Sequence, residues 1–108
     1  IETKTAPSIS AGTLTLNCAS GNVFVVSLNA NITTLSFSNV PTTGSAYGMV
    51  LQFIADGTAR TVTWGASVKW PSGTAPTLTS TNGKADTFVL MTYDGGTSWF
   101  AFTAGQNS

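Results

Sequence analysis

The chain has 108 residues, enough for one domain with a single hydrophobic core. Hydrophobic residues make up 42% of it and charged residues only 7%, where ~25% charged residues is typical. This balance excludes a disordered chain, and the net charge of zero excludes a protein that binds nucleic acid through a basic surface. The surface must consist of Thr, Ser, Asn and Gly, a composition that suits extracellular particles and repetitive assemblies.

The only cysteine, Cys18, permits no internal disulfide, and we expect it to be a small buried side chain. No apolar run approaches the ~20 residues that cross a bilayer, so no membrane insertion is expected, and no signal peptide is visible. The sequence starts at Ile1 rather than Met, which suggests a processed product or a fragment of a longer polypeptide.

The first third of the chain predicts three strands. Residues 1–11 are polar and without periodicity, so we expect an extended lead-in or linker. Residues 12–17 alternate Thr and Leu, the period-2 pattern of a strand with one buried face. Residues 23–28 are β-branched and aromatic, and are predicted to pair with 12–17 as a hairpin. Residues 32–38 alternate again and predict the third strand.

The middle of the chain predicts a second hairpin and a long loop. Residues 46–55 are apolar on both faces, which requires a cover on both sides, and in a small domain another subunit often supplies it. Residues 60–64 follow an Asp-Gly turn and predict the returning strand. Residues 65–85 contain Pro and Gly at intervals that forbid a helix, with a short edge strand expected at 77–79.

The last third predicts the clearest hairpin. Residues 88–93 are again apolar on both faces, and Asp94-Gly95-Gly96 turns the chain into residues 98–103. In the returning strand Trp99 and Ala101 share one face, and Phe100 and Phe102 share the other. Residues 105–108 form a polar tail. The candidates for a subunit interface are Tyr47, Met49, Val50, Ile54, Val89, Met91, Tyr93 and Phe100.

Together these elements predict an all-β fold with eight or nine short strands and little or no helix. The regular spacing of short strands favours a compact antiparallel β-sandwich, jelly-roll-like, occupying residues 12–104 as a single domain.

The sequence offers little for catalysis. Histidine is absent, which removes the commonest general base and most zinc sites. The only carboxylates are Glu2, Asp56, Asp86 and Asp94, and the Asp-Gly positions of Asp56 and Asp94 predict side chains bonded to their own turns. No phosphate-binding loop or calcium loop is present, and the four basic residues are scattered. We therefore expect no enzyme activity, no cofactor and no metal.

The tryptophans are the other possible binding feature, because an aromatic ring can stack on a sugar. The alternation of residues around Trp64 and Trp99 favours core positions for both. Trp70 precedes a proline in the long loop and is the better surface candidate. The predicted surface contacts are Lys69, Trp70, Pro71 and Thr74.

Three stretches carry a resemblance to a known family: residues 31–41 (NITTLSFSNVP), residues 60–78 (from RTVTW to VKWPSGTAPTL) and residues 83–99 (from GKAD to YDGGTSW). The chain resembles the structural and tail-fibre-like proteins of tailed bacteriophages, many from marine and cyanobacterial hosts, over roughly residues 12–104. The run from Val68 to Leu78 is the most specific part. One departure is Trp64-Gly65, where the family pattern has Trp-Pro.

The resemblance implies a non-enzymatic virion domain displayed on a fibre, spike or capsid surface, and fibres are usually three-fold, so we expect a homotrimer. Our first hypothesis is a fibre, spike or tail-fibre head that self-assembles, contacts other virion proteins and attaches to a glycan on the host cell surface. Two alternatives remain: a capsid-decorating or head-fibre protein with an assembly role only, and a carbohydrate-binding module.

Overall fold

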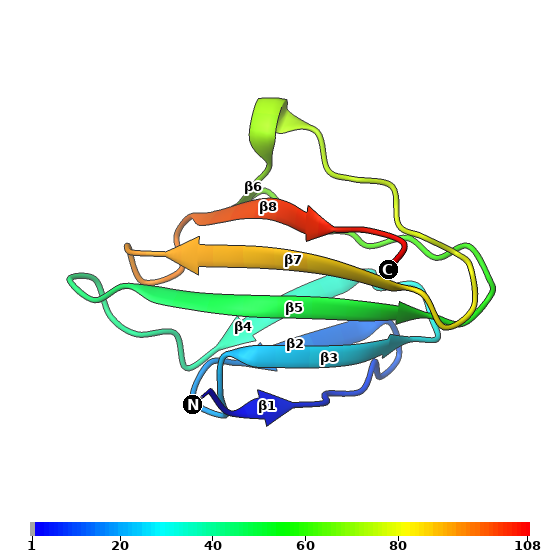
Figure 1. Cartoon of the computed structure of the whole chain (residues 1–108). Coiled ribbons are helices and arrows are strands. Elements are labelled where there is room, and N and C mark those ends of the chain that lie inside the picture. Colours follow the sequence, from blue (N-terminus) through cyan, green and yellow to red (C-terminus); the bar gives the residue numbers. More distant parts are fainter. Residues whose placement is uncertain (1) are drawn as a thin grey trace.

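The computed structural model describes residues 2–108 as two β-sheets, one of six strands and one of two (Figure 1). The strands are β1 Lys4–Thr5, β2 Thr13–Asn17, β3 Val23–Leu28, β4 Thr34–Ser38, β5 Tyr47–Ala55, β6 Val68–Lys69, β7 Ala85–Thr92 and β8 Trp99–Gly105. Within the described residues the only helical element is a 3-10 turn, η1 Pro71–Gly73. The prediction of an all-β chain with little helix is confirmed. Nowhere in residues 2–108 is a helix long and apolar enough to cross a membrane.

Most neighbouring strands run parallel. The large sheet has the order β1-β3-β5-β7-β8-β6, and the small sheet pairs β2 with β4. The pairs β1–β3, β3–β5, β6–β8 and β2–β4 are parallel, and only β7 runs against its neighbours. The prediction of antiparallel pairing is therefore wrong for most of the fold. The connectivity also differs from a jelly roll, which is built from antiparallel strands.

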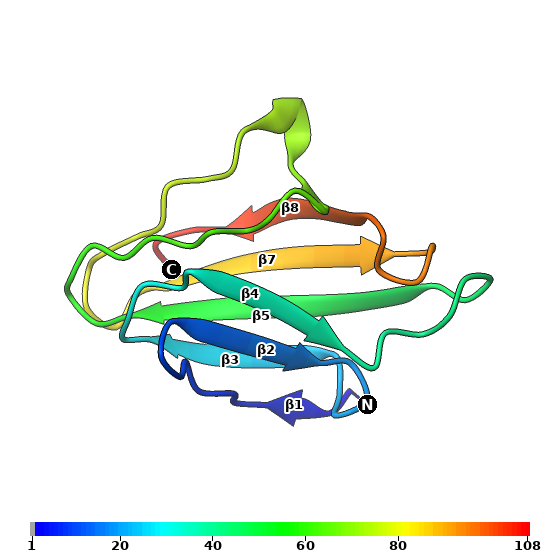
Figure 2. The same cartoon turned by 180° about the vertical axis from the view of Figure 1, so that it is seen from behind.

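The first half of the chain alternates between the two sheets. From β1 to β5 the chain passes from the large sheet to the small sheet and back twice, so that β2 and β4 form a second layer, which lies in front of β3 and β5 when the molecule is seen from behind (Figure 2). The predicted hairpin of residues 12–17 with 23–28 is wrong. Both strands carry an apolar side, and the turn between them places those sides opposite each other across the layers, where Leu14, Leu16, Phe24 and Val26 are buried.

The second predicted hairpin, over residues 46–64, is also wrong. β5 pairs with β3 and β7, which supply longer partners than residues 60–64. That segment makes one parallel bridge from Val62 to Ile32, which continues the small sheet beyond β4. The expected edge strand at 77–79 is absent from the described structure, where the Thr79 N–H donates to the carboxylate of Asp86 at 2.6 Å.

The hairpin of β7 and β8 is confirmed, and Asp94 holds its turn. The Thr92 hydroxyl and the Ser98 N–H both donate to Oδ1 of Asp94, at 3.0 and 2.9 Å. The backbone hydrogen bond from Ser98 holds the pKa of Asp94 below its usual range. The side chain thus bonds its own turn, as its Asp-Gly position predicts.

The core lies between the sheets and is rich in aromatic side chains. Trp99, Phe24, Phe53 and Phe88 are among the largest fully buried side chains. Trp64 is also buried, so the core positions predicted for Trp64 and Trp99 are confirmed. Cys18 is buried as well, and its burial raises the pKa of its thiol.

Both ends of the chain are attached to the large sheet. Within the predicted lead-in, Lys4–Thr5 form the edge strand β1, while Ile1 lies outside the described residues. At the other end, Ser108 exchanges two backbone hydrogen bonds with Ala85, at 3.1 and 3.2 Å. The expected linker and tail are therefore partly ordered parts of the domain.

Candidate interaction surface

The most prominent surface of the molecule is the side of the six-stranded sheet that faces away from β2 and β4, here called the outer face. Side chains alternate along each strand, so β5 turns Met49, Leu51 and Phe53 toward the core. The intervening residues, Val50 and Ile54 among them, point to the outer face. The period-2 pattern that buries one side of β5 therefore leaves an apolar side without a cover.

Strand register places these outward side chains in rows across the sheet. The first row runs from Lys4 through Val23, Val50 and Val89 to Phe102. A second row, displaced from the first by two residues along each strand, contains Gly48, Met91, Phe100 and Lys69. Each row has apolar side chains in its middle and a lysine at one end.

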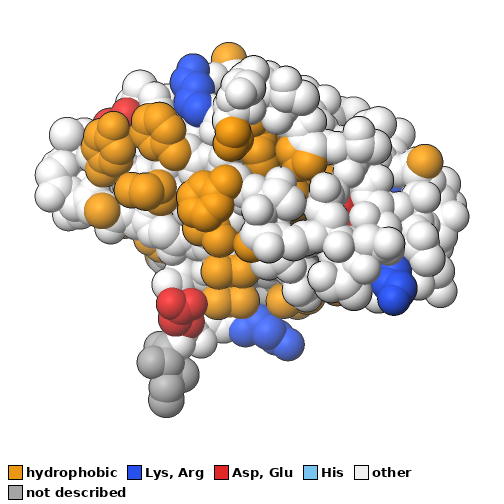
Figure 3. Space-filling view, turned by 45° about the horizontal axis from the view of Figure 1, so that its top comes forward, with side chains coloured by type: hydrophobic (Ala, Val, Ile, Leu, Met, Phe, Trp, Pro, Cys, Tyr) orange, Lys and Arg blue, Asp and Glu red, His pale blue; other side chains and the backbone are white. Residues whose placement is uncertain are grey.

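Four large apolar side chains on the outer face are well exposed: Met91 and Phe100 at 38%, Phe102 at 46% and Tyr93 at 56%. The ring of Tyr93 stacks on that of Phe100, with centroids 5.6 Å apart and planes at 9°. Hydrophobic side chains gather on one half of this face, with charged groups around them (Figure 3). A contiguous exposed apolar patch on a soluble domain commonly marks an interaction site.

A shallow hollow of about 380 Å³ adjoins the apolar rows and is lined by Glu2, Asn22, Gly48, Val50 and Val89 among others. It exists because Gly48 has no side chain, and a Cβ added there would meet nothing closer than the Leu90 carbonyl oxygen at 4.0 Å. The outer face therefore has a shallow depression at Gly48.

The structure divides the predicted interface residues into two groups. Val50, Ile54, Val89, Met91, Tyr93 and Phe100 lie on the outer face. Tyr47 and Met49 lie on the core side of β5, which corrects their prediction as interface residues. Met49 is only 2% exposed, and the Tyr47 hydroxyl donates to the Gly21 carbonyl. Sequence reasoning missed Phe102, although its alternation with Phe100 placed both side chains on one face.

The predicted surface loop divides in the same way. Lys69, Pro71 and Thr74 are exposed, and Nζ of Lys69 donates to the Ala66 carbonyl at 3.0 Å. Trp70 is only 9% exposed and packs edge-on against Trp64 and Phe88, with ring centroids 4.9 and 5.6 Å away. Its ring packs the long loop against the core. The prediction of Trp70 as a surface contact is therefore corrected to a packing role.

Two more carboxylates, those of Asp56 and Asp86, are engaged in structure. Asp56 forms an ion pair with Arg60 at 2.7 Å, and the hydrogen bond from Arg60 holds the pKa of Asp56 below its usual range. Burial raises the pKa of Asp86, but hydrogen bonds from Thr79, Asn107 and Gln106 outweigh burial and hold the pKa below its usual range. Among residues 2–108, no three acidic, cysteine or histidine side chains gather to hold a metal ion.

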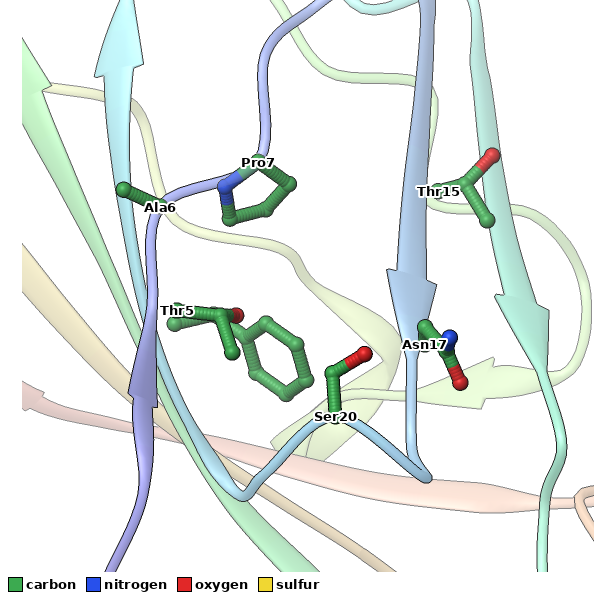
Figure 4. Close-up of a pocket in the computed structure, with 7 residues that line it drawn as sticks. Thr5, Ala6, Pro7, Thr15, Asn17 and Ser20 are labelled. Atoms are coloured by element: carbon green, nitrogen blue, oxygen red, sulfur yellow. The ribbon is translucent and has the colours of Figure 1, made fainter.

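A second hollow, of about 280 Å³, lies between the segment after β1 and strand β2 (Figure 4). Its lining includes the hydroxyls of Thr5, Thr15 and Ser20, the amide of Asn17, and the apolar Pro7. No carboxylate, thiol or basic group lines it. The hollow is therefore equipped for hydrogen bonding to a neutral group and not for acid–base chemistry.

No protein-family model matches the chain, and no curated protein or solved structure matches it either. The resemblance to phage virion proteins therefore rests on the sequence motifs.

Proposed function

We propose that this chain is a non-enzymatic structural domain of a tailed-phage particle, located in a fibre, spike or tail-fibre head. It works as a small β-sandwich that assembles with copies of itself and attaches the particle to the host surface. The single observation that supports this proposal is the outer face, where Met91, Tyr93, Phe100 and Phe102 expose apolar surface on a flat sheet. A flat apolar face is suited to packing against another protein surface and not to enclosing a substrate.

The proposed assembly is a homotrimer, because the family resemblance implies a fibre-like protein and fibres are usually three-fold. Three outer faces turned toward a common axis would give Val50 and Val89 the second cover that two-sided apolar strands require. Sheet faces pack about 10 Å apart when their side chains interdigitate, and branched and aromatic side chains on these strands can do so.

The attachment part of the proposal rests on the long loop of residues 71–84. Most of its residues are exposed, and hydroxyl and amide side chains dominate it. Such a surface can exchange hydrogen bonds with the hydroxyl groups of a host glycan, and its only charged side chain is Lys84. The start of this loop, η1, projects beyond the edge strand β6 (Figure 1).

Light scattering on the purified chain tests the assembly. The expected mass is three times the 11.1 kDa of the chain. A chain that stays monomeric at all concentrations refutes the assembly proposal. Cryo-electron microscopy of the purified particle then locates the domain: density in a fibre or spike supports the proposal, and density on the capsid surface favours a decorating protein.

One observation favours a second function. The exposed aromatic rings of Tyr93, Phe100 and Phe102 could stack on sugar rings instead of on another subunit, as in a carbohydrate-binding module. Such a module binds as a monomer. A monomeric chain that binds soluble oligosaccharides, and loses this binding on Phe102→Ser, would replace the virion proposal with this one.

A further inference from the structure

The two edges of the outer face carry charged groups at matching positions. β1 and β6 are the edge strands of the large sheet. Lys69, on β6, is exposed at one end of the second row, next to Phe100. Glu2 precedes Lys4 of β1 by two residues, so in an extended chain its side chain points to the same side as that of Lys4.

Two contacts place Glu2 at the other end of that row. The Thr3 carbonyl accepts hydrogen bonds from the N–H groups of Asn22 and Val23, so the chain at Glu2 runs beside Gly21. Glu2 also lines the hollow formed around Gly48, which belongs to the second row. The row therefore begins at an acidic side chain on one edge and ends at a basic side chain on the other, while Lys4 lies one row further along, level with Phe102.

We infer that copies of this chain pack outer face to outer face around an axis parallel to the strands, with Glu2 of one copy beside Lys69 of the next. The inference rests on the proposed self-assembly and adds its geometry. Rotation about an axis along the strands brings the β1 edge of one sheet to the β6 edge of the next at the same height. Rotation about an axis across the strands would instead bring each β1 edge to another β1 edge.

Charge and area both favour a second copy of the chain as the partner that covers the outer face. Between the two edges the described residues of these two rows are apolar or glycine, so the charges that the rows offer are those of the chain's own edges. The four most exposed side chains together leave roughly 350 Å² accessible, at about 200 Å² for each whole side chain. With the half-buried valines the total is roughly 500 Å² per copy, which matches the ~1,000 Å² of total buried area that a specific interface requires.

Disulfide trapping tests the geometry. Within one chain Glu2 and Lys69 are separated by five strand spacings, roughly 24 Å, which no disulfide can bridge. Any bond formed by the double variant Glu2→Cys with Lys69→Cys therefore joins two copies, and Cys18 is buried and does not compete. The expected result on a non-reducing gel is a ladder that ends at a closed ring. The single variant Glu2→Cys, and the pair Glu2→Cys with Lys84→Cys, are expected to give no cross-link.

A charge exchange gives an independent measurement. Lys69→Glu is expected to weaken self-association by up to about fivefold per contact, and adding Glu2→Lys restores it. Lys84→Glu, an exposed lysine away from these rows, is the matched control and leaves association unchanged. Circular dichroism verifies that each variant keeps the fold.

The outcomes separate the inference from the proposed function. If the wild type is oligomeric but the double variant forms no cross-link, the proposed axis is wrong and the assembly proposal stands. The same holds if Glu2→Cys alone cross-links. Failure of the charge exchange to restore association also overturns the axis. A monomeric wild type overturns both.

Discussion

Replacing Phe102 by threonine removes a large apolar side chain from the outer face and leaves the core untouched. The side chain is 46% exposed in the single chain. A whole phenylalanine side chain has about 200 Å², so about 90 Å² remains available for burial in an assembly. At ~25 cal/mol per Å² this corresponds to about 2 kcal/mol for each copy.

In a trimer the three copies lose about 6 kcal/mol together, which lowers the trimer association constant by about 10⁴-fold. The isolated domain should be little affected, because threonine favours strands and the site is half exposed; its free energy of unfolding should change by less than about 1 kcal/mol. Sedimentation equilibrium at several concentrations measures the association, and urea unfolding measures the fold.

The matched control is Phe102→Leu, which keeps most of the apolar area and should keep the association within about tenfold of wild type. An unchanged association constant for Phe102→Thr would refute the assignment of the outer face to self-assembly. Loss of the fold in Phe102→Thr would instead refute the burial argument, since the side chain would then be part of the core.

Three further predictions concern the interior. Asp86→Asn should lower the free energy of unfolding by about 1–3 kcal/mol at pH 7, because the carboxylate accepts hydrogen bonds from Thr79, Gln106 and Asn107. The folded-state pKa of Asp86 lies below its usual value, so this stabilisation is present above about pH 4 and is lost as the pH falls through the folded pKa; unfolding curves from pH 7 to 2 should show the variant and wild type converging. Trp70→Ala should cost about 3–5 kcal/mol by thermal unfolding, whereas a surface ring would cost almost nothing. Cys18 should react with a thiol reagent only after unfolding, and rapid labelling of the native protein would contradict its burial.

The alternation along each strand allowed much of the fold to be predicted, because side chains in a strand point to opposite faces in turn. The pairs Trp99 with Ala101 and Phe100 with Phe102 were placed on opposite sides correctly. The β7–β8 hairpin was also predictable, since Asp-Gly-Gly between two runs of alternating residues is a strong turn signal, and the Asp94 side chain bonds this turn. Burial of Trp64 and Trp99 followed from the same pattern.

The candidate surface was only partly predictable, because β5 and β7 are apolar on both faces. In such a strand the pattern separates two sides and does not say which one meets the core. Met49 and Val50 were therefore equally good candidates, and the packing of β2 and β4 against one side of the large sheet buried Met49 and left Val50 outward. Trp70 was misplaced for a related reason, since a loop has no alternation from which to predict burial.

The sequence by itself determined that this protein is built of short strands, which residues share a side of each strand, and that Asp56 and Asp94 would bond their own turns. Only the tertiary structure decided the direction and order of the strands. A turn of five residues between β2 and β3 can close a hairpin or cross between layers, and the choice depends on which apolar sides meet over the whole core. That non-local choice made most of the sheet parallel, and it left the outer face open as the surface on which the proposed assembly depends.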